Sequence, residues 1–518
     1  MAKSQKLSSA SLGIFRRFPA IITFFLFFII VFFSFGTRFY DLGNPGYYVF
    51  DENYFIPMAQ KYMRGEFFGD PHPPTGKLLI TAGAYFYPDD IKEGELTDES
   101  PSAPTESLVK YRYVPAFFSA VLPLLVFIVI HLFTKSNLLS FLGGFLITFD
   151  NALLVHGRFA LFDEILFAFV LISLVFTLLF VKYSRGDIKD IFKGRNLFKR
   201  LALLLFSGIF AGLALSTKFI GLASVGFLCL AIVYRTFLDR YTLNLKSAIF
   251  ILAQIVIPFL AILGVFYGSF AIHFKLLKSS GVNLEEFSQA YQDCITKDKS
   301  GCQISNAALT NESIKWSFNY ENRVPAVDFC KEGEMGSTPK QWPFMGRAIA
   351  YSFSNHSTIP LSTVSYVYLT GNPIVWYSGL LAVVFGFSLL VVSFFLLKSL
   401  INKKILFILF AYFINYAPYF FIQRVMYFYH YFPAMIFSVI LLMLLLQEFH
   451  RLNLKGKLPD LQKGLFVLLY VMLAFVFFLL YSPLSYNRKV DISYVKKIIF
   501  STQWNLKADP YNYNPTSE

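Results

Sequence analysis

Two adjoining stretches, FFLFFIIVFFSFGTRFY (Phe24–Tyr40) and FDENYFIPMAQKYMRGEFFGDPHPPTGK (Phe50–Lys77), predict the fold class of the whole chain. The first has no charged residue before Arg38, and with its apolar flank it approaches the roughly 20 apolar residues that a membrane helix needs. The second places two adjacent carboxylates, a histidine between prolines and a lysine just beyond it. We therefore predict a membrane span with a polar cluster at its exit. No small-residue cleavage site follows the apolar run, so we expect the span to be retained.

The composition indicates a polytopic membrane protein. Of the 518 residues, 56% are hydrophobic and only 15% are charged, which is too little charge for a soluble chain of this length. The formal charge of +14 would favour a nucleic-acid partner in a soluble protein. Here the collection of Lys and Arg in cytoplasmic loops accounts for it, so we expect membrane lipids around the chain and no nucleic acid.

Apolar runs of about bilayer length predict an all-α fold of eleven membrane-spanning helices. The predicted spans are residues 19–36, 114–133, 138–155, 164–182, 201–216, 219–236, 247–272, 373–397, 405–421, 431–447 and 464–481.

Basic residues fix the predicted orientation. If the N-terminus, with basic residues between 3 and 17, lies in the cytoplasm, the basic segment 182–200 and the later basic loops lie there as well. The chain is then one membrane domain, residues 1–518, with two long outer loops at 37–113 and 273–372 and an outer C-terminal tail at 482–518. The segment 99–107 (ESPSAPTES) is expected to be a flexible turn.

Cysteine and metal-ligand patterns are limited. Cys294, Cys302 and Cys330 share the second outer loop, which permits one disulfide in an oxidising compartment but leaves the pairing open. Cys229, in an apolar span, is expected to be packing. No closely spaced set of histidines and carboxylates predicts a metal, so we predict no cofactor, and a divalent ion near Asp51 stays an open alternative.

Ionisable residues gather near the outer ends of the predicted spans. Because charge at membrane depth is costly, such residues usually line a cavity or pair with one another, and either role fits each one singly. They are Asp51, Glu52, His72, Lys77, Arg112, Arg158, Asp163, Glu164, Lys218, Arg347, Arg424 and His430. Arg158, Lys218 and Arg424 lie one in each short outer turn, so together they predict a basic pocket for a phosphate at the outer leaflet.

The Asp51–Glu52 doublet opens a short helix predicted over residues 50–64. A carboxylate there can cap the helix and favour its dipole. It can also act as a general base that takes the proton of an attacking hydroxyl. The residues alone leave both roles open, and they do not decide which carboxylate would be the base.

The segment DPHPPTGK (70–77) predicts a rigid turn, because prolines stiffen it and Gly76 permits a close approach. His72 would orient a partner by a hydrogen bond, and Lys77 would either contact a phosphate or support the turn. The glycine–lysine pair is not a phosphate loop, since the GxxxxGK[ST] spacing is absent.

Six patches of this sequence, in the family's own order, resemble the protein O-mannosyltransferase family, membrane glycosyltransferases of the GT-C type. The patches are the Asp-Glu doublet with HPPTGK, DNALLVHGRFALFDEILFAF (150–169), LSTKFIGL (215–222), WPFMGRAIAY (342–351) with GNPIVWY (371–377), NYAPYFFIQRVMYFYHYFPA (415–434), and YSPLSY (481–486) with Trp504.

The resemblance implies a GT-C fold and an inverting reaction. Mannose would pass from dolichyl- or polyprenyl-phosphate-mannose to Ser or Thr of extracytoplasmic proteins. It also implies that Asp51 is the catalytic base with Glu52 beside it, and that Arg424, His430, Lys218 and Arg158 contact the donor phosphate. His72, Lys77, Arg112, Asp163 and Arg347 would be supporting residues.

The chain departs from the family pattern in places. The family's Arg at the start of the second span aligns with Ala116, and Arg112, one helical turn earlier, would replace it. The second outer loop is too short for the MIR module of eukaryotic members. This favours a bacterial-type enzyme of the inner membrane over one of the endoplasmic reticulum.

Two other functions remain as alternatives. One is a GT-C transferase that moves another lipid-linked sugar onto a glycolipid or glycan. The other is a lipid or sugar transporter, which would be expected to show repeated halves and polar residues at the bilayer midplane, and neither feature is found. A WWDxGY-like motif, expected of an oligosaccharyltransferase, is also absent from the sequence.

Overall fold

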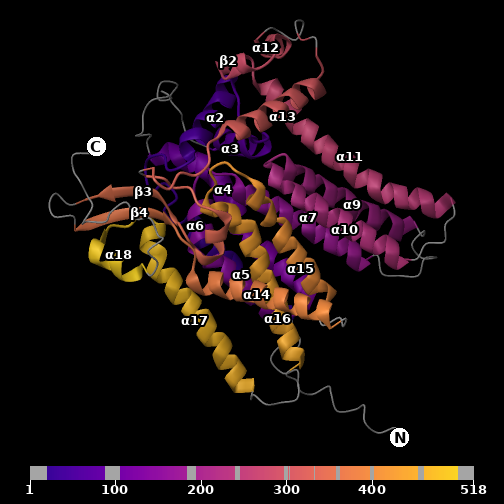
Figure 1. Ribbon diagram of the computed structural model, residues 1–518, viewed down its shortest axis with the longest axis vertical. Helices are drawn as coiled ribbons and strands as arrows, with labels where there is room; N and C mark the ends of the chain where they lie inside the picture. The colour runs from indigo at the N-terminus through magenta and orange to yellow at the C-terminus, as the bar shows by residue number, and fades with distance from the viewer. Residues whose placement is uncertain are drawn as a thin grey trace. The chain divides into compact units, whose positions relative to one another are not determined.

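The computed structural model describes residues 20–87, 105–183, 194–239, 245–296, 302, 304–331, 333–356, 362–396, 402–452 and 460–499 (Figure 1). The basic N-terminal residues, residues 88–104 and 184–193, and the C-terminal tail beyond residue 499, which includes Trp504, lie outside these ranges. The chain divides into two compact units. The first unit holds residues 1–40, 123–156 and 326–518, and the second holds 41–122 and 157–325.

The second unit combines four long apolar helices with the two loops that flank them. Its elements are α2 (Glu52–Arg64), β1 (Glu66–Phe68), α3 (Thr75–Phe86), the first part of α4 (Thr105–Thr134), α7 (Asp163–Tyr183), α9 (Gly194–Leu215), η1 (Phe219–Gly221), α10 (Leu222–Asp239), α11 (Leu245–Leu276), β2 (Ser279–Val282), η2 (Leu284–Glu286), α12 (Gln289–Thr296) and α13 (Asn306–Arg323).

The first unit contains the remaining helices and a three-stranded sheet. Its elements are α1 (Ala20–Phe39), the end of α4, α5 (Asn137–Thr148), α6 (Asn151–Gly157), η4 (Pro339–Phe344), β3 (Ile349–Asn355), β4 (Thr363–Leu369), α14 (Pro373–Phe395), α15 (Lys403–Ile414), η5 (Ala417–Phe421), η6 (Phe428–Tyr431), α16 (Phe432–Leu452), α17 (Asp460–Ser485), β5 (Val490–Asp491) and α18 (Ile492–Ile498).

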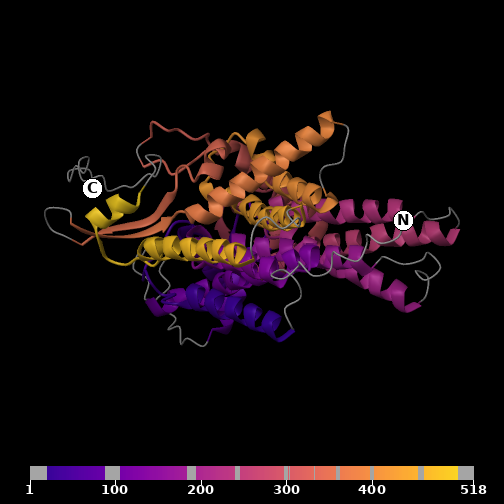
Figure 2. The same ribbon diagram turned by 90° about the horizontal axis from the view of Figure 1, so that it is seen from below.

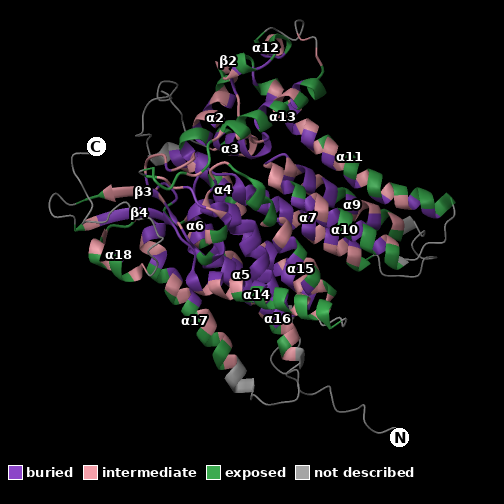
Figure 3. Cartoon of the chain, in the orientation of Figure 1, coloured by how far each residue is buried: buried purple, intermediate pink, exposed green. Residues whose placement is uncertain are grey.

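Each of the eleven predicted spans falls on apolar helical sequence of the described chain, and one of them, 138–155, is divided between α5 and α6. Nine helices there are long and apolar enough to cross a membrane, α5 and α6 form a tenth candidate bent by 60°, and α1 is a shorter apolar helix. Helices α7 and α16 are mostly buried, whereas α17 exposes most of its apolar surface (Figure 3). The all-α membrane fold is therefore confirmed, and the count of eleven crossings stays a prediction.

Local sequence signals explain where several helices begin and end. Asn372 caps α14 by accepting from the Ile374 amide, with Pro373 in the first helical position. The predicted helix over 50–64 is present as α2. It ends at Gly65, whose φ of 72° is a left-handed conformation that glycine adopts without strain.

The two loops of the second unit that are predicted to lie outside share a hydrophobic core. Strand β1 pairs in parallel with β2 of the second loop, with Glu66 opposite Ser279. The buried members of this core are Tyr62, Phe67, Phe68, Leu277, Leu284, Phe287, Tyr291, Ile295, Leu309 and Trp316. The packing joins α2 to α12 and α13, so the second loop folds onto the loop that carries the Asp-Glu doublet.

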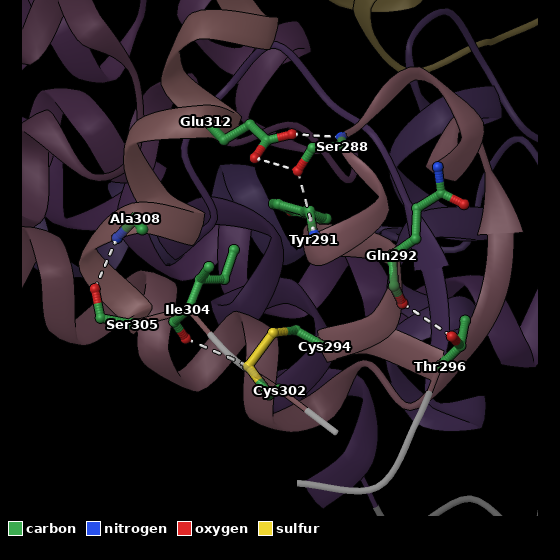
Figure 4. Close-up of a disulfide and its surroundings, with 10 residues drawn as sticks. All are labelled: Ser288, Tyr291, Gln292, Cys294, Thr296, Cys302, Ile304, Ser305, Ala308 and Glu312. Atoms are coloured by element: carbon green, nitrogen blue, oxygen red, sulfur yellow. Dashed lines mark hydrogen bonds between the residues drawn. A yellow bond between two sulfur atoms is a disulfide. The ribbon is translucent and has the colours of Figure 1, made fainter. Parts of the chain in front are cut away.

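A disulfide closes part of the second loop. It joins Cys294 of α12 to Cys302, next to the Ser288–Glu312 hydrogen bonds that tie α12 to α13 (Figure 4). The sequence permitted one disulfide here, and the structure assigns its partners. Cys330 and Cys229 are free and exposed.

In the first unit, β3, β4 and β5 form an antiparallel sheet in the order β3-β4-β5. Ile349 pairs with Leu369, and Thr363 pairs with Asp491 at the other end of β4. Strand β4 is buried along most of its length. Its contacts with α17 attach the sheet to that helix (Figure 2).

Candidate active site

Asp51 occupies the position just before α2, in the second unit. Its backbone carbonyl accepts from the Tyr54 and Phe55 amides at 2.9 and 3.0 Å, but its side chain makes no capping hydrogen bond. The preceding residue, Phe50, has a φ of 51°, a left-handed conformation that bulky side chains rarely adopt and that is enriched at functional sites. The capping role considered for this carboxylate therefore has no support in the geometry.

Glu52 is fully buried and has donors on both carboxylate oxygens. Arg112 donates from Nε to Oε1 and from Nη2 to Oε2, each at 2.8 Å. The Ala160 amide donates to Oε1 at 2.9 Å and the Val49 amide to Oε2 at 3.1 Å. An acceptor hydroxyl would have to displace one of these donors to reach the carboxylate.

Arg112, in the third turn of α4, uses its other donors on a single loop. Nη1 donates to the carbonyls of Leu42 and Pro45, and Nη2 donates to the carbonyl of Tyr47. The guanidinium also lies 4.8 Å from the ring centre of Phe159. Arg112 is thus a supporting residue that holds the loop before Asp51 against the turn after α6.

That turn carries Arg158 and Asp163. Arg158 is buried, and its Nη2 donates to the carbonyl of Asp41 at 2.7 Å. Asp163, the first residue of α7, accepts from Lys218 Nζ at 2.9 Å. Because Ala160 also contacts Glu52, this short turn connects the Asp-Glu doublet to the Lys218 turn within the second unit.

Phe162 is the centre of these contacts. Its ring packs against Phe55 of α2 and edge-on against His72, with ring centres 4.5 and 5.5 Å apart. The ammonium groups of Lys77 and Lys218 lie 5.9 and 5.7 Å from the same ring centre, within cation–π range. The sequence interpretation did not single out Phe162, because one more aromatic residue in an apolar segment carries no signal.

Lys77 is a supporting residue of the proline-rich turn. Its ammonium donates to Asp70 at 2.6 Å and to the carbonyls of His72 and Pro73 at 2.7 and 3.3 Å. The side chain is 1% exposed, and three acceptors occupy its three donors. The geometry therefore favours the supporting role over the phosphate contact that was the alternative for Lys77.

Asp70, the partner of Lys77, was not among the predicted site residues. Burial alone would raise the pKa of its carboxyl, but the Lys77 ammonium and the contacts with His72 outweigh burial and lower the pKa. The partners lie seven residues apart with three prolines between them, so no regular helix or strand predicts their contact from the sequence.

His72 is held neutral. Burial, followed by the positive charge of Lys218, lowers the pKa of its imidazole to about 3. The ring borders a small cavity, together with Asp70, His273 and Trp316. A neutral imidazole can both donate and accept one hydrogen bond, which agrees with the orienting role considered for His72.

Gly76 and Thr75 attach this turn to the segment that carries Lys218. Thr75 donates from its amide and from its hydroxyl to Ser216, at 2.9 and 2.8 Å. A side chain at Gly76 would place its Cβ 2.5 Å from the Cβ of Phe162. The close approach expected of Gly76 is therefore confirmed.

In the first unit, Arg347 supports the loop that faces the Arg424 segment. It donates from Nε to the Gly336 carbonyl at 2.7 Å and from Nη2 to the Glu334 carbonyl at 2.6 Å. The Ser337 amide in turn donates to the carbonyl of Met426 at 2.7 Å. Arg347 thus holds the loop that bonds to Met426, and Met426 lies two residues after Arg424 in the sequence.

Arg424 and His430 lie on either side of this short segment. Arg424 is half-buried and donates to the adjacent Val425 carbonyl at 2.9 Å. His430 is nearly buried, and its ring stacks on Trp342 with centres 6.0 Å apart. Its Nδ1 lies 2.9 Å from the Tyr427 carbonyl and 3.2 Å from the Tyr427 amide, so the tautomer decides which contact forms.

The structure therefore groups eight of the eleven predicted residues in the second unit and the other three in the first. The eight are Asp51, Glu52, His72, Lys77, Arg112, Arg158, Asp163 and Lys218. Arg347, Arg424 and His430 form the other group. Among the described residues, no cluster of three or more His, Cys, Asp or Glu could hold a metal ion.

Two family models match the chain. The model described as "Dolichyl-phosphate-mannose-protein mannosyltransferase" matches residues 28–278. The model described as "C-terminal four TMM region of protein-O-mannosyltransferase" matches residues 316–504. Between them the two models leave only the chain ends and one short segment unmatched.

Curated relatives match about half of the chain. Protein O-mannosyltransferase 1 of Drosophila melanogaster is 30% identical over 274 residues, which are 50% of this chain and 28% of that protein. Dolichyl-phosphate-mannose–protein mannosyltransferase 1 of Candida albicans is 29% identical over 264 residues, 50% of this chain and 29% of that protein. The chain thus spans less than a third of the length of these relatives.

Among solved structures, the protein O-mannosyltransferase Pmt1-Pmt2 complex of S. cerevisiae bound to the sugar donor has a TM-score of 0.78. The match is 17% identical and covers 96% of this chain and 95% of that one. The apo oligosaccharyltransferase of Archaeoglobus fulgidus gives a TM-score of 0.50 at 12% identity, over 90% of this chain and 56% of that one. These similarities confirm the predicted GT-C fold.

Proposed function

This chain belongs to the protein O-mannosyltransferase family, and we propose that it transfers mannose from a dolichyl- or polyprenyl-phosphate-mannose donor to Ser or Thr hydroxyls of proteins, with inversion. The observation that carries the proposal is the division of labour between Asp51 and Glu52. Glu52 is fully engaged by Arg112 and two amides, whereas Asp51 is half-buried and does not cap its helix.

Asp51 would act as the general base. As the acceptor oxygen forms its bond to the anomeric carbon of mannose, the hydroxyl proton passes to the Asp51 carboxylate. The bond from the anomeric carbon to the phosphate oxygen breaks on the opposite face, which inverts the configuration. The electron pair of that bond leaves with the polyprenyl phosphate.

Cations would stabilise the charge that develops on the leaving phosphate. Lys218 is one candidate, since its ammonium lies beside Phe162, which also contacts α2. Arg424 is another, because it is half-buried and lies in the patch 415–434 that resembles the family. His430 can add a donor from Nε2 in the tautomer whose Nδ1 accepts from the Tyr427 amide. Arg158 would contribute from a buried position.

We propose that the active site faces the extracytoplasmic side, with the N-terminus in the cytoplasm. Contacts between helix ends support this topology. The Tyr486 hydroxyl, just after α17, donates to the Thr37 carbonyl of α1 at 2.9 Å, and Arg488 donates to the Tyr40 hydroxyl at 3.0 Å. The C-terminal ends of α1 and α17 therefore lie at the same level.

If the C-terminal ends of α1 and α17 lie on the same face of the membrane, the chain crosses the membrane an even number of times between them. The nine long apolar helices together with the bent α5–α6 pair give ten, which favours the eleven-span count with α1 included. At the opposite ends, Lys404 of α15 donates to the Phe133 carbonyl, and Gln447 of α16 donates to the Thr134 carbonyl. This agrees with α4 and α16 ending, and α15 beginning, on the cytoplasmic face.

The experiment that tests the function is a transfer assay with the purified full chain in lipid nanodiscs. Polyprenyl-phosphate-mannose and a peptide rich in Ser and Thr are the substrates, without added metal and in a parallel reaction with a chelator. We expect mannose on the peptide, released by β-elimination as from any O-linked sugar. Transfer only from a different lipid-linked sugar, or only to a glycolipid, would replace this proposal by the other GT-C activity. Donor uptake without any transfer would favour a transporter.

A further inference from the structure

Helix α18 folds back against the last turns of α17 instead of leading away from it. The Tyr494 hydroxyl donates to the Leu480 carbonyl at 2.6 Å, and the Tyr481 hydroxyl donates to the Ile498 carbonyl at 3.0 Å. Val495, between these two contacts, is fully buried. Figures 1 and 2 show α18 beside the C-terminal end of α17.

These contacts fix the depth of α18 relative to the membrane. Leu480 and Tyr481 lie inside the apolar stretch Gly464–Ser485, one turn before its end. A helix bonded to that turn lies at the level where the stretch leaves the hydrocarbon core, which is the level of the lipid headgroups. Tyrosine, the residue that makes both contacts, is enriched at this boundary in membrane proteins.

The segment that connects α17 to α18 is anchored at the same level by α1. Arg488 donates to the hydroxyl of Tyr40 and lies 5.4 Å from the centre of its ring. The ring of Tyr40 also packs edge-on against Tyr486, with centres 5.5 Å apart. Tyr40 is 58% exposed, so the side chain that holds Arg488 borders the surroundings of the protein.

The surface formed in this way is strongly basic. Arg488, Lys489, Lys496 and Lys497 are all exposed, and we call these four residues the basic face. Asp491 is the one acidic residue between 486 and 499, and it accepts from the Ser493 amide at 2.7 Å as the cap of α18. The segment 486–499 therefore carries a net charge of +3, from four cations and one anion.

The neighbouring surface is apolar. Val476, Leu479 and Leu480 of α17 are exposed, and α17 has the smallest buried share among the long apolar helices of the described chain. A basic segment bonded to the end of a helix with exposed apolar side chains matches a lipid molecule, with phosphate at one end and acyl chains at the other. An acidic protein would need the cations but not the exposed apolar side chains of α17.

We propose that the basic face binds the phosphate groups of anionic phospholipids in the leaflet where α1 and α17 end. A lysine or arginine near a membrane surface typically strengthens binding to anionic lipids by about fivefold. The binding would anchor the outer end of α17, and through β5 the sheet of the first unit, at the headgroup level. This inference depends on α17 being a membrane span and not on which sugar is transferred.

The test is a lipid-retention measurement on the purified full chain. Protein in micelles with equal amounts of phosphatidylglycerol and phosphatidylcholine is washed, and the retained lipids are counted by native mass spectrometry. We expect the wild type to retain phosphatidylglycerol preferentially, and Lys496→Gln/Lys497→Gln to bind it at least about tenfold more weakly. Lys496→Arg/Lys497→Arg should behave as the wild type, since the charge is kept.

The matched control is Lys315→Gln/Lys331→Gln, which removes two exposed lysines that are distant in sequence from any predicted span end. It should retain as much phosphatidylglycerol as the wild type, and all variants should unfold at similar temperatures. Equal retention by the wild type and Lys496→Gln/Lys497→Gln would overturn the proposal. Displacement of bound lipid by an acidic peptide, but not by phosphatidylglycerol vesicles, would also overturn it, in favour of a protein partner.

Discussion

Arg112 and Glu52 form a two-point ion pair in which Nε and Nη2 each lie 2.8 Å from a different carboxylate oxygen, and both side chains are fully buried. Together they hold the loop before Asp51, the first turn of α2 and the turn after α6 in one fixed arrangement. The pair distinguishes two adjacent carboxylates that are equivalent in the sequence. Glu52 is part of the scaffold, whereas Asp51 lies just before α2 and does not use its side chain to cap that helix.

The first prediction concerns stability. Glu52→Gln leaves the buried guanidinium of Arg112 without its counter-charge, which typically costs about 3–5 kcal/mol when one partner of a buried pair is removed. We expect a clearly lower unfolding temperature in detergent, measured by intrinsic fluorescence. Since Arg112 keeps three carbonyl acceptors, the lower end of this range applies. An unchanged unfolding temperature would contradict the scaffold role of Glu52.

The second prediction concerns activity. Asp51→Asn keeps the size of the side chain and removes its basicity, so transfer should fall by about 10²–10⁴-fold. The unfolding temperature should change little, because no capping hydrogen bond is lost and the helix-dipole contribution is at most about 1 kcal/mol. Donor binding, measured with a non-transferable lipid analogue, should persist. Near-normal turnover by this variant would refute the assignment of Asp51 as the base.

The third prediction concerns the proline-rich turn. Gly76→Ala would bring a Cβ within 2.5 Å of Phe162, and such overpacking costs about 1–3 kcal/mol. Because Phe162 also contacts His72 and Lys218, transfer should fall together with stability. Gly268→Ala is the control: nothing lies within 4 Å of the added Cβ, and alanine favours a helix by about 0.5–1 kcal/mol. Equal unfolding temperatures for the two variants would argue against this close approach.

The apolar spans could be predicted from the sequence because each is a long run of residues with a single common property. The break within one predicted span, 138–155, could not be predicted in the same way. Asp150 Oδ1 caps α6 by accepting from the Leu153 amide, while Oδ2 accepts from the Asn372 amide and the Trp376 indole. Two patches that resembled the family, DNALL and GNPIVW, are thus bonded to each other, and their role in this structure is to join α6 to α14.

The site residues were predictable as a set and not as pairs. We selected these residues because they lie near the predicted outer ends of the spans. Which of them form ion pairs depends on how the loops fold, and the sequence does not show that. Asp70 with Lys77 and Glu52 with Arg112 are examples, since seven and sixty residues separate the partners. The Asp163–Lys218 pair likewise joins two turns that are predicted to lie outside, and nothing in the sequence indicates that these two residues pair.

The fourth prediction concerns pH. The pKa of His72 is about 3 in the folded protein and about 6.5 in an unfolded chain, so between these values the unfolded state binds a proton that the folded state does not. Stability should therefore fall as the pH decreases below about 6.5, by at most about 1.4 kcal/mol per pH unit from this residue. His72→Gln should flatten the pH dependence of the unfolding temperature between about pH 6.5 and 4.5.

Asp70 acts in a different pH range, which keeps the two contributions separable. Its folded pKa is lowered, so the stability that it contributes is present above the unfolded value of about 3.9 and is lost as the pH falls through the folded value. Asp70→Asn should therefore lower stability at neutral pH and leave the slope between about pH 6.5 and 4.5 unchanged. The same slope in wild type and His72→Gln would contradict a neutral His72.

The last prediction separates the two arginines of the first unit. Arg347 donates to the carbonyls of Glu334 and Gly336, so Arg347→Ala should lower the unfolding temperature by loosening that loop. Arg424 is half-buried and donates to the carbonyl of the adjacent Val425, so Arg424→Ala should lower the unfolding temperature less than Arg347→Ala. If Arg424 contacts the donor phosphate, its loss raises the apparent KM for polyprenyl-phosphate-mannose more than the KM for the peptide, because only the donor carries the phosphate. A charge-assisted contact is worth about 1.5–3 kcal/mol, so the donor KM should rise by about tenfold or more. An unchanged donor KM in Arg424→Ala, together with a normal unfolding temperature, would remove Arg424 from the phosphate site.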